Sequence, residues 1–77
     1  MPDEIRRPRH YMGDGQIECM DARRSMMTGA DVTNEQAFWW GNAFKYLWRW
    51  PWKNGRADLL KAQRCIEYLL EVTDGDD

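Results

Sequence analysis

The sequence predicts a small all-α domain of three helices with an extended N-terminal arm, and this domain is expected to assemble as a homo-oligomer. Three observations carry the prediction. Apolar residues recur at three- and four-residue spacing in three segments, without the strict alternation of a half-buried strand. Turn-forming residues separate these segments. Five tryptophans in 77 residues exceed what one small globule is expected to cover, because its surface is large for its volume.

The chain divides into three parts by composition. Residues 1–9 contain two prolines and charges of both signs, so they are predicted to form the extended arm. The helical domain is expected to span residues 10–72, and residues 73–77 form an acidic tail. The first helix is predicted over residues 17–27, with apolar positions at Ile17, Met20 and Met27.

The second helix is predicted over residues 34–50. Thr33 and Gln36 have the spacing of a capping box, in which each side chain bonds a backbone amide of the other residue. Gly41 lowers helix stability by about 1 kcal/mol relative to alanine, and it would permit the close approach of a neighbouring helix or of a bound group. The core stripe is expected to consist of Trp40, Phe44 and Leu47.

The third helix is predicted over residues 56–72. Pro51 ends the preceding helix because proline lacks the required amide and clashes with the previous turn. Asn54 and Gly55 supply the connecting turn. The amphipathic stripe of this helix consists of Leu59, Ala62, Ile66 and Leu69.

Composition also limits the class of protein. No segment approaches the ~18 apolar residues of a membrane span, and the N-terminal residues lack the apolar stretch of a signal peptide. Cys19 and Cys65 are therefore expected to be free thiols that pack between helices in a reducing cytoplasm. A net charge of −2 argues against general nucleic-acid binding, for which a strongly basic balance is typical.

Cations and aromatic rings alternate between residues 42 and 62. Asn42, Lys45 and Arg49 share one helix face, and Lys53 and Lys61 follow beyond the proline. The cations could bind an anion, and the flat apolar rings beside them could stack on another ring. This combination suits a nucleotide. On composition and spacing alone, however, a packed aromatic core with solvated lysines is the more common explanation.

The same residues carry a resemblance to a known family. The chain contains His10-Tyr11, then Gly41-Asn42-Ala43-x-Lys45-Tyr46-Leu47-x-Arg49, then Lys53-Asn54-Gly55-x-x-Asp58-Leu59-x-Lys61-Ala62. Over residues 10–70 this pattern resembles the SaV-like family of small bacteriophage proteins, a domain of unknown function that includes a phage deoxynucleotide kinase. The resemblance implies a phage origin, nucleotide handling and a location in the host bacterial cytoplasm.

The leading hypothesis is a protein that sequesters a phosphorylated or cyclic nucleotide signal of host anti-phage defence. Sequestration requires no catalytic residue, metal or cofactor. Lysines and Arg49 would contact phosphate, aromatic rings would stack on the base, and Asn42 would bond a base edge, a sugar hydroxyl or, alternatively, a neighbouring helix. His10 would donate a hydrogen bond to a phosphate when protonated, or else serve as a structural histidine. The candidate ligand-binding residues are His10, Tyr11, Asn42, Lys45, Trp48, Arg49, Trp52, Lys53 and Lys61.

Two alternatives remain at this point. One is a nucleoside monophosphate kinase without a Walker A motif, with Mg²⁺ held by Glu18, Asp21 or Asp58. Glu18 and Asp21 share one helix face, but an acid pair at this spacing is most often surface charge. The other is a module that binds a host protein through exposed tryptophans, since tryptophan and arginine are frequent interface anchors.

Overall fold

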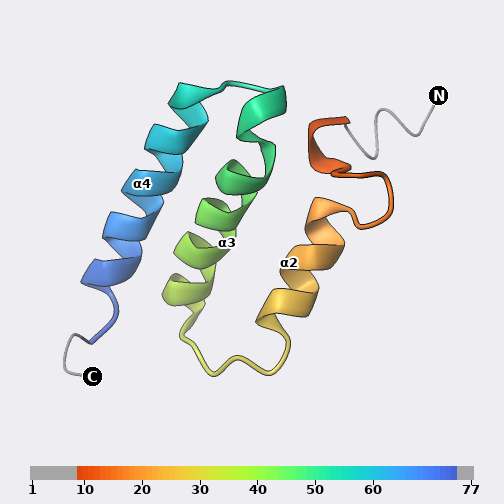
Figure 1. The fold of residues 1–77 in the computed structure, drawn as a ribbon. Coiled ribbons are helices and arrows are strands. Elements are labelled where there is room, and N and C mark those ends of the chain that lie inside the picture. The colour runs from red at the N-terminus through yellow and green to blue at the C-terminus, as the bar shows by residue number, and fades with distance from the viewer. Residues whose placement is uncertain (1–8, 75–77) are drawn as a thin grey trace.

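The computed structural model describes residues 9–74, and these residues form three α-helices and two short 3-10 helices, without a strand among them. In Figure 1, α3 lies between α2 and α4, and the three helices run side by side. The predicted all-α fold of three helices is thus confirmed. The elements, in chain order, are η1 (Arg9–Tyr11), α2 (Cys19–Met27), α3 (Asn34–Arg49), η2 (Trp50–Trp52) and α4 (Arg56–Glu71).

The structure describes the predicted N-terminal arm and acidic tail only in part. The arm predicted over residues 1–9 lies outside them except for Arg9, which opens η1. Of the predicted tail, Thr73 and Asp74 are described, and the Thr73 hydroxyl donates to the Leu69 carbonyl at 2.7 Å. None of the helices formed by residues 9–74 combines the length and the apolar character that crossing a bilayer requires.

Local sequence signals fix both ends of α3. The Thr33 hydroxyl accepts from the Gln36 amide at 3.0 Å, and the Gln36 side chain accepts from the Thr33 amide at 2.9 Å. The predicted capping box is therefore formed. At the other end, Pro51 stands inside η2, where the α-helix gives way to a short 3-10 turn.

Helices α3 and α4 form an antiparallel hairpin around small side chains. Ala43, Ala62 and Cys65 are buried, which lets the two backbones approach closely. On one flank, the Trp39 and Tyr68 rings pack with their centroids 4.5 Å apart. The open end of the hairpin is tied by the Gln36 side-chain amide, which donates to the Val72 carbonyl at 3.1 Å.

Helix α2 packs against α3 at Gly41. A methyl group placed on Gly41 would lie 3.3 Å from Cε of Met27 and 3.5 Å from Cδ of Arg23. The glycine thus permits the close helix approach that the sequence indicated. Cys19, at the start of α2, is buried, and both cysteines are free thiols. Their expected role as packing residues agrees with this burial.

Several positions predicted to be buried are exposed instead. The first helix starts two residues later than predicted, and Ile17 and Met20 are 56% and 45% exposed. Leu47 and Ile66, assigned to core stripes, are 49% and 42% exposed, and Leu59 is also exposed. The core assignments on α3 and α4 were wrong for the single chain because α2 packs on the side of α3 that carries Gly41 and leaves the opposite flank uncovered.

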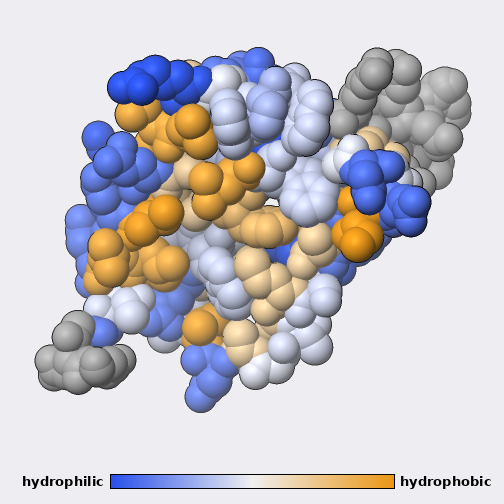
Figure 2. All heavy atoms as spheres, in the orientation of Figure 1, coloured by the Kyte–Doolittle hydropathy of each residue, from blue (hydrophilic) through white to orange (hydrophobic). Residues whose placement is uncertain are grey.

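The uncovered flank contains a groove between α3 and α4, here called the apolar groove. Its volume is about 390 Å³. Figure 2 shows apolar surface gathered over α4 and the adjoining part of α3 on the visible face. The residues that line the groove are Val32, Gln36, Trp40, Ile66, Leu69, Leu70 and Thr73.

Candidate ligand-binding cleft

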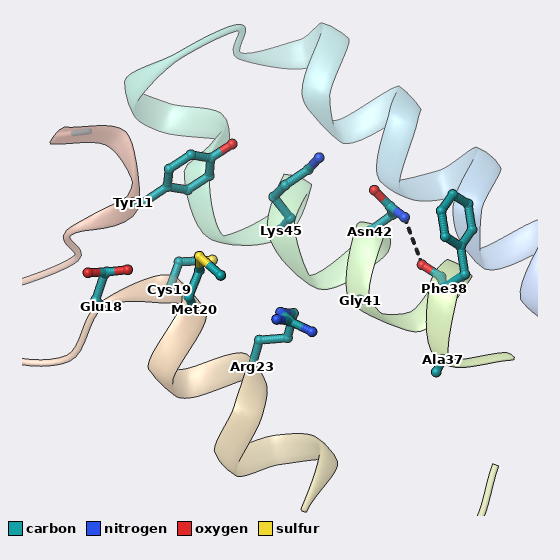
Figure 3. A pocket seen from close by; sticks show the side chains of 10 residues that line it. All are labelled: Tyr11, Glu18, Cys19, Met20, Arg23, Ala37, Phe38, Gly41, Asn42 and Lys45. Carbon is teal, nitrogen blue, oxygen red and sulfur yellow. Dashed lines mark hydrogen bonds between the residues drawn. The ribbon is translucent and has the colours of Figure 1, made fainter. Parts of the chain in front are cut away.

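A second hollow, here called the α2–α3 cleft, has a volume of about 500 Å³. Figure 3 shows Tyr11 at one end and Ala37 and Phe38 at the other, with Arg23 and Lys45 contributed by the two facing helices. The remaining walls are largely apolar. The full lining consists of Tyr11, Glu18, Cys19, Met20, Arg23, Ala37, Phe38, Gly41, Asn42 and Lys45.

Three of the nine predicted ligand-binding residues line this cleft: Tyr11, Asn42 and Lys45. The Asn42 amide nitrogen donates to the Phe38 carbonyl one turn earlier at 2.8 Å, so the bond to another helix weighed above is not formed by this group. Arg23 was not predicted, although it is the one other cation in the lining. Arg23 reaches the cleft because α2 docks against α3 at Gly41, and no pattern within α2 indicates that contact.

A cluster of cations surrounds the Tyr46 ring between α3 and α4. The Lys45 ammonium lies 4.9 Å from the ring centroid, and the Lys61 ammonium lies 5.6 Å from it. The Arg49 guanidinium carbon lies at 4.8 Å from the same centroid. Three predicted cations therefore meet at one aromatic ring, and Lys45 belongs to both this cluster and the cleft.

Arg49 is occupied by protein groups. Its Nε and Nη2 donate to the two carboxylate oxygens of Asp58, each at 3.1 Å, and its Nη1 donates to the Tyr11 hydroxyl at 2.7 Å. The Arg49 and Asp58 residues are 7% and 0% exposed. The guanidinium therefore donates to protein oxygens, whereas the sequence predicted a contact with phosphate.

The charges of this ion pair are stabilised by their hydrogen bonds. Burial would raise the pKa of the Asp58 carboxyl, but bonds from Arg49 and from the Asn54 side chain and amide outweigh it, so the pKa lies below its usual value. Burial would likewise lower the pKa of Arg49, and its bonds to Asp58 and Tyr11 raise it. Both groups are thus ionised at neutral pH.

Acid is expected to weaken the fold through Asp58. A carboxyl whose pKa is lower in the folded state stabilises the fold above the unfolded pKa of about 3.9, and this contribution falls as the pH drops towards the folded pKa. The difference between the free energies of unfolding of wild type and Asp58→Asn, measured by urea denaturation, should therefore be constant from pH 7 to about 5 and should shrink as the pH falls through about 4. A difference that stays constant below about pH 4 would contradict the assignment.

The other predicted ligand-binding residues do not line the cleft. The Trp48 indole donates to the Tyr11 carbonyl at 3.2 Å, while Trp52 is 59% exposed and Lys53 is exposed in the turn before α4. The His10 ring packs on Tyr11 with centroids 4.2 Å apart. Burial, followed by the nearby charges of Lys53 and Arg49, lowers the pKa of His10, so the imidazole is mostly uncharged at pH 7.

The three acids considered for Mg²⁺ do not form a cluster. Asp58 is engaged by Arg49, Asp21 pairs with Arg24 at 3.3 Å on the surface, and Glu18 lies at the cleft. Within residues 9–74, no group of three or more histidine, cysteine, aspartate or glutamate side chains is arranged to hold a metal ion.

Fold and site together define a small all-α protein with a partly cationic cleft beside a helical hairpin. Residues 5–67 match the model of a family described as a protein of unknown function (DUF3310). Because the match covers most of the chain, the protein belongs to the DUF3310 family. No curated protein and no solved structure matches the chain.

Proposed function

We propose that this protein binds a phosphorylated, ring-bearing ligand of the nucleotide class in the α2–α3 cleft and does not convert it. The observation that supports this most directly is the position of Lys45, which lines the cleft and shares the Tyr46 ring with Lys61. Within residues 9–74, neither lysine forms an ion pair with an acid. A phosphate would supply the missing negative charge.

The size and lining of the cleft agree with such a ligand. Small-molecule sites typically measure about 300–1,000 Å³ and combine apolar walls with a few polar groups. This cleft has about 500 Å³, with Phe38 and Tyr11 as flat walls and Asn42 as a polar group for a base or sugar. Arg23 adds a second cation, whose Nη1 donates a weak hydrogen bond to the Met27 sulfur at 3.9 Å.

Sequestration has more support than phosphoryl transfer. Asp58, one of three carboxylates available to a kinase-like reaction, is completely buried and bound to Arg49. Glu18 is the one acid among the described residues that line the cleft. A binding protein requires none of these carboxylates. Together with the resemblance to small bacteriophage proteins, this favours capture of a cyclic or otherwise phosphorylated nucleotide signal of host defence.

Calorimetric titration with cyclic dinucleotides, cyclic mononucleotides and nucleoside mono-, di- and triphosphates tests the proposal. Wild type should bind at least one of these compounds, and chromatography should recover it unchanged. Lys45→Met and Arg23→Met should each weaken binding about tenfold or more, because a hydrogen bond to a charged group contributes about 1.5–3 kcal/mol.

Arg24→Met is the matched control. Arg24 neighbours Arg23 on α2, but it is exposed, pairs with Asp21 and does not line the cleft. Its replacement should leave the affinity unchanged. Absence of heat with every compound would reject the binding function, whereas a diphosphate product formed from ATP and a monophosphate would favour the kinase alternative.

We also propose that the apolar groove is covered by the same groove of a second copy. None of its lining residues is charged, so a symmetric contact of the groove with itself brings no like charges together. Val32, Ile66 and Leu70 are 42%, 42% and 67% exposed in the single chain. A domain of this size has little core of its own, and oligomerisation is a common source of further stability.

A further inference from the structure

Arg49 is a buried cation, and it links the turn before α4 to one wall of the cleft. Asp58 holds two guanidinium nitrogens, and Asn54 in turn donates to the Asp58 carboxylate from its amide at 3.3 Å and from its side chain at 3.2 Å. The third guanidinium nitrogen donates to the Tyr11 hydroxyl at 2.7 Å. The bonds thus run without a gap from Asn54 to Tyr11.

Contacts with the end of α3 help to hold the segment around Tyr11, and η1 also lies against η2. The Tyr11 carbonyl accepts from the Trp48 indole at 3.2 Å. Gly13, at φ +60°, lies so close to the same indole that an added Cβ would stand 2.7 Å from Cζ2. These contacts, like the hydrogen bond from Arg49 to the Tyr11 hydroxyl, are made by side chains in the last turn of α3.

We infer that Arg49 and Asp58 are positioning residues for ligand binding, which they support by fixing the Tyr11 wall of the α2–α3 cleft. The inference rests on the proposed binding function. A guanidinium fixed by two bonds to a carboxylate has one orientation, so its remaining nitrogen defines where the Tyr11 hydroxyl lies. Two apolar side chains in place of the pair would fill the same space without fixing that hydroxyl.

The position of Tyr11 gives this arrangement a consequence for the ligand. Its ring closes one end of the cleft, as Figure 3 shows, and its hydroxyl points away from the α2 side of the cleft, towards α3. A ring held in place before binding loses less conformational freedom when a base stacks against it. Loss of the hydrogen bond between Arg49 and the Tyr11 hydroxyl should therefore weaken ligand binding even though the ring remains.

The test uses Tyr11→Phe, which removes only the hydroxyl, and Arg49→Lys, which keeps the positive charge but loses the planar guanidinium and its several donors. In the unliganded protein, hydrogen exchange of the amides of residues 10–17 should become about tenfold faster in both variants, as expected for the loss of a bond to a charged group. The affinity for the nucleotide that wild type binds should fall about five- to tenfold.

Thr33→Ala is the control for stability alone. It removes the capping box of α3, far from Tyr11, and should lower the overall stability by an amount similar to the loss of one hydrogen bond. It should change neither the affinity nor the exchange of residues 10–17 relative to the rest of the chain. Equal loss of affinity in Thr33→Ala, or wild-type exchange in Tyr11→Phe, would overturn the inference.

The same design separates the two proposals. If wild type binds no nucleotide, the binding function fails, and the role in ligand binding fails with it. The exchange measurements need no ligand, so they still decide whether Arg49 fixes the Tyr11 segment. If wild type binds and both variants bind equally well, the binding function stands and the positioning role is rejected.

Discussion

Replacing Asp58 with alanine is expected to lower the free energy of unfolding by about 3–5 kcal/mol, because the change leaves the buried Arg49 guanidinium without its counter-charge. A domain of this size rarely has more than roughly 3–5 kcal/mol from its core. The variant should therefore be largely unfolded at 25 °C in the absence of other stabilisation. Urea denaturation followed by helical circular dichroism measures the loss.

The double variant Arg49→Met with Asp58→Leu is the matched control. Apolar residues that replace a buried ion pair are often neutral or stabilising, since the cost of removing two charges from water disappears. The double variant should thus retain helix content near that of wild type. Because it cannot anchor the Tyr11 hydroxyl, it should still bind nucleotide more weakly. A loss below about 1 kcal/mol in Asp58→Ala would show that the pair is not buried as described.

Helix positions followed from local signals in the sequence. Thr33 and Gln36 lie within one turn, and their capping bonds depend on little beyond that turn. Pro51 likewise ends α3 by its own geometry. Such signals require no knowledge of what the helix packs against, which is why the three helices were predicted with ends displaced by only one or two residues.

The ion pair was not predicted because its partners were interpreted separately. Arg49 is in the last turn of α3 and Asp58 is in the first turn of α4, so they meet only when the hairpin closes. From the sequence, Arg49 was predicted to contact phosphate, and Asp58 was considered as a ligand of Mg²⁺. Opposite charges on the two sides of a tight helix connection were the signal that would have paired them.

The composition of the cleft depends on how helices dock, which the pattern of single helices does not specify. Tyr11, Asn42 and Lys45 were predicted from one face of α3 and the segment before α2. Arg23 and Phe38 were missed because their role depends on the contact of α2 with Gly41. The same docking leaves Leu47 and Ile66 exposed, although their spacing is that of core residues.

Replacing Leu70 with glutamate is expected to prevent the proposed self-association through the apolar groove. Leu70 lines the apolar groove and is 67% exposed in the single chain, so a charge there costs little in the monomer but would be buried in the proposed interface. A penalty of about 3 kcal/mol would weaken association roughly 100-fold. Size-exclusion chromatography with light scattering at micromolar concentration measures the mass of wild type and variant.

Leu60→Glu is the control on the same helix. Leu60 is the same residue type as Leu70 and is 51% exposed, but it does not line the groove. Its replacement should therefore leave the mass unchanged. Dissociation by both variants would indicate a different interface, and a monomeric wild type would reject self-association through the groove. In that last case the groove would remain an uncovered apolar surface, and a search for a different protein partner would begin with Leu70→Glu as the variant that should not bind it.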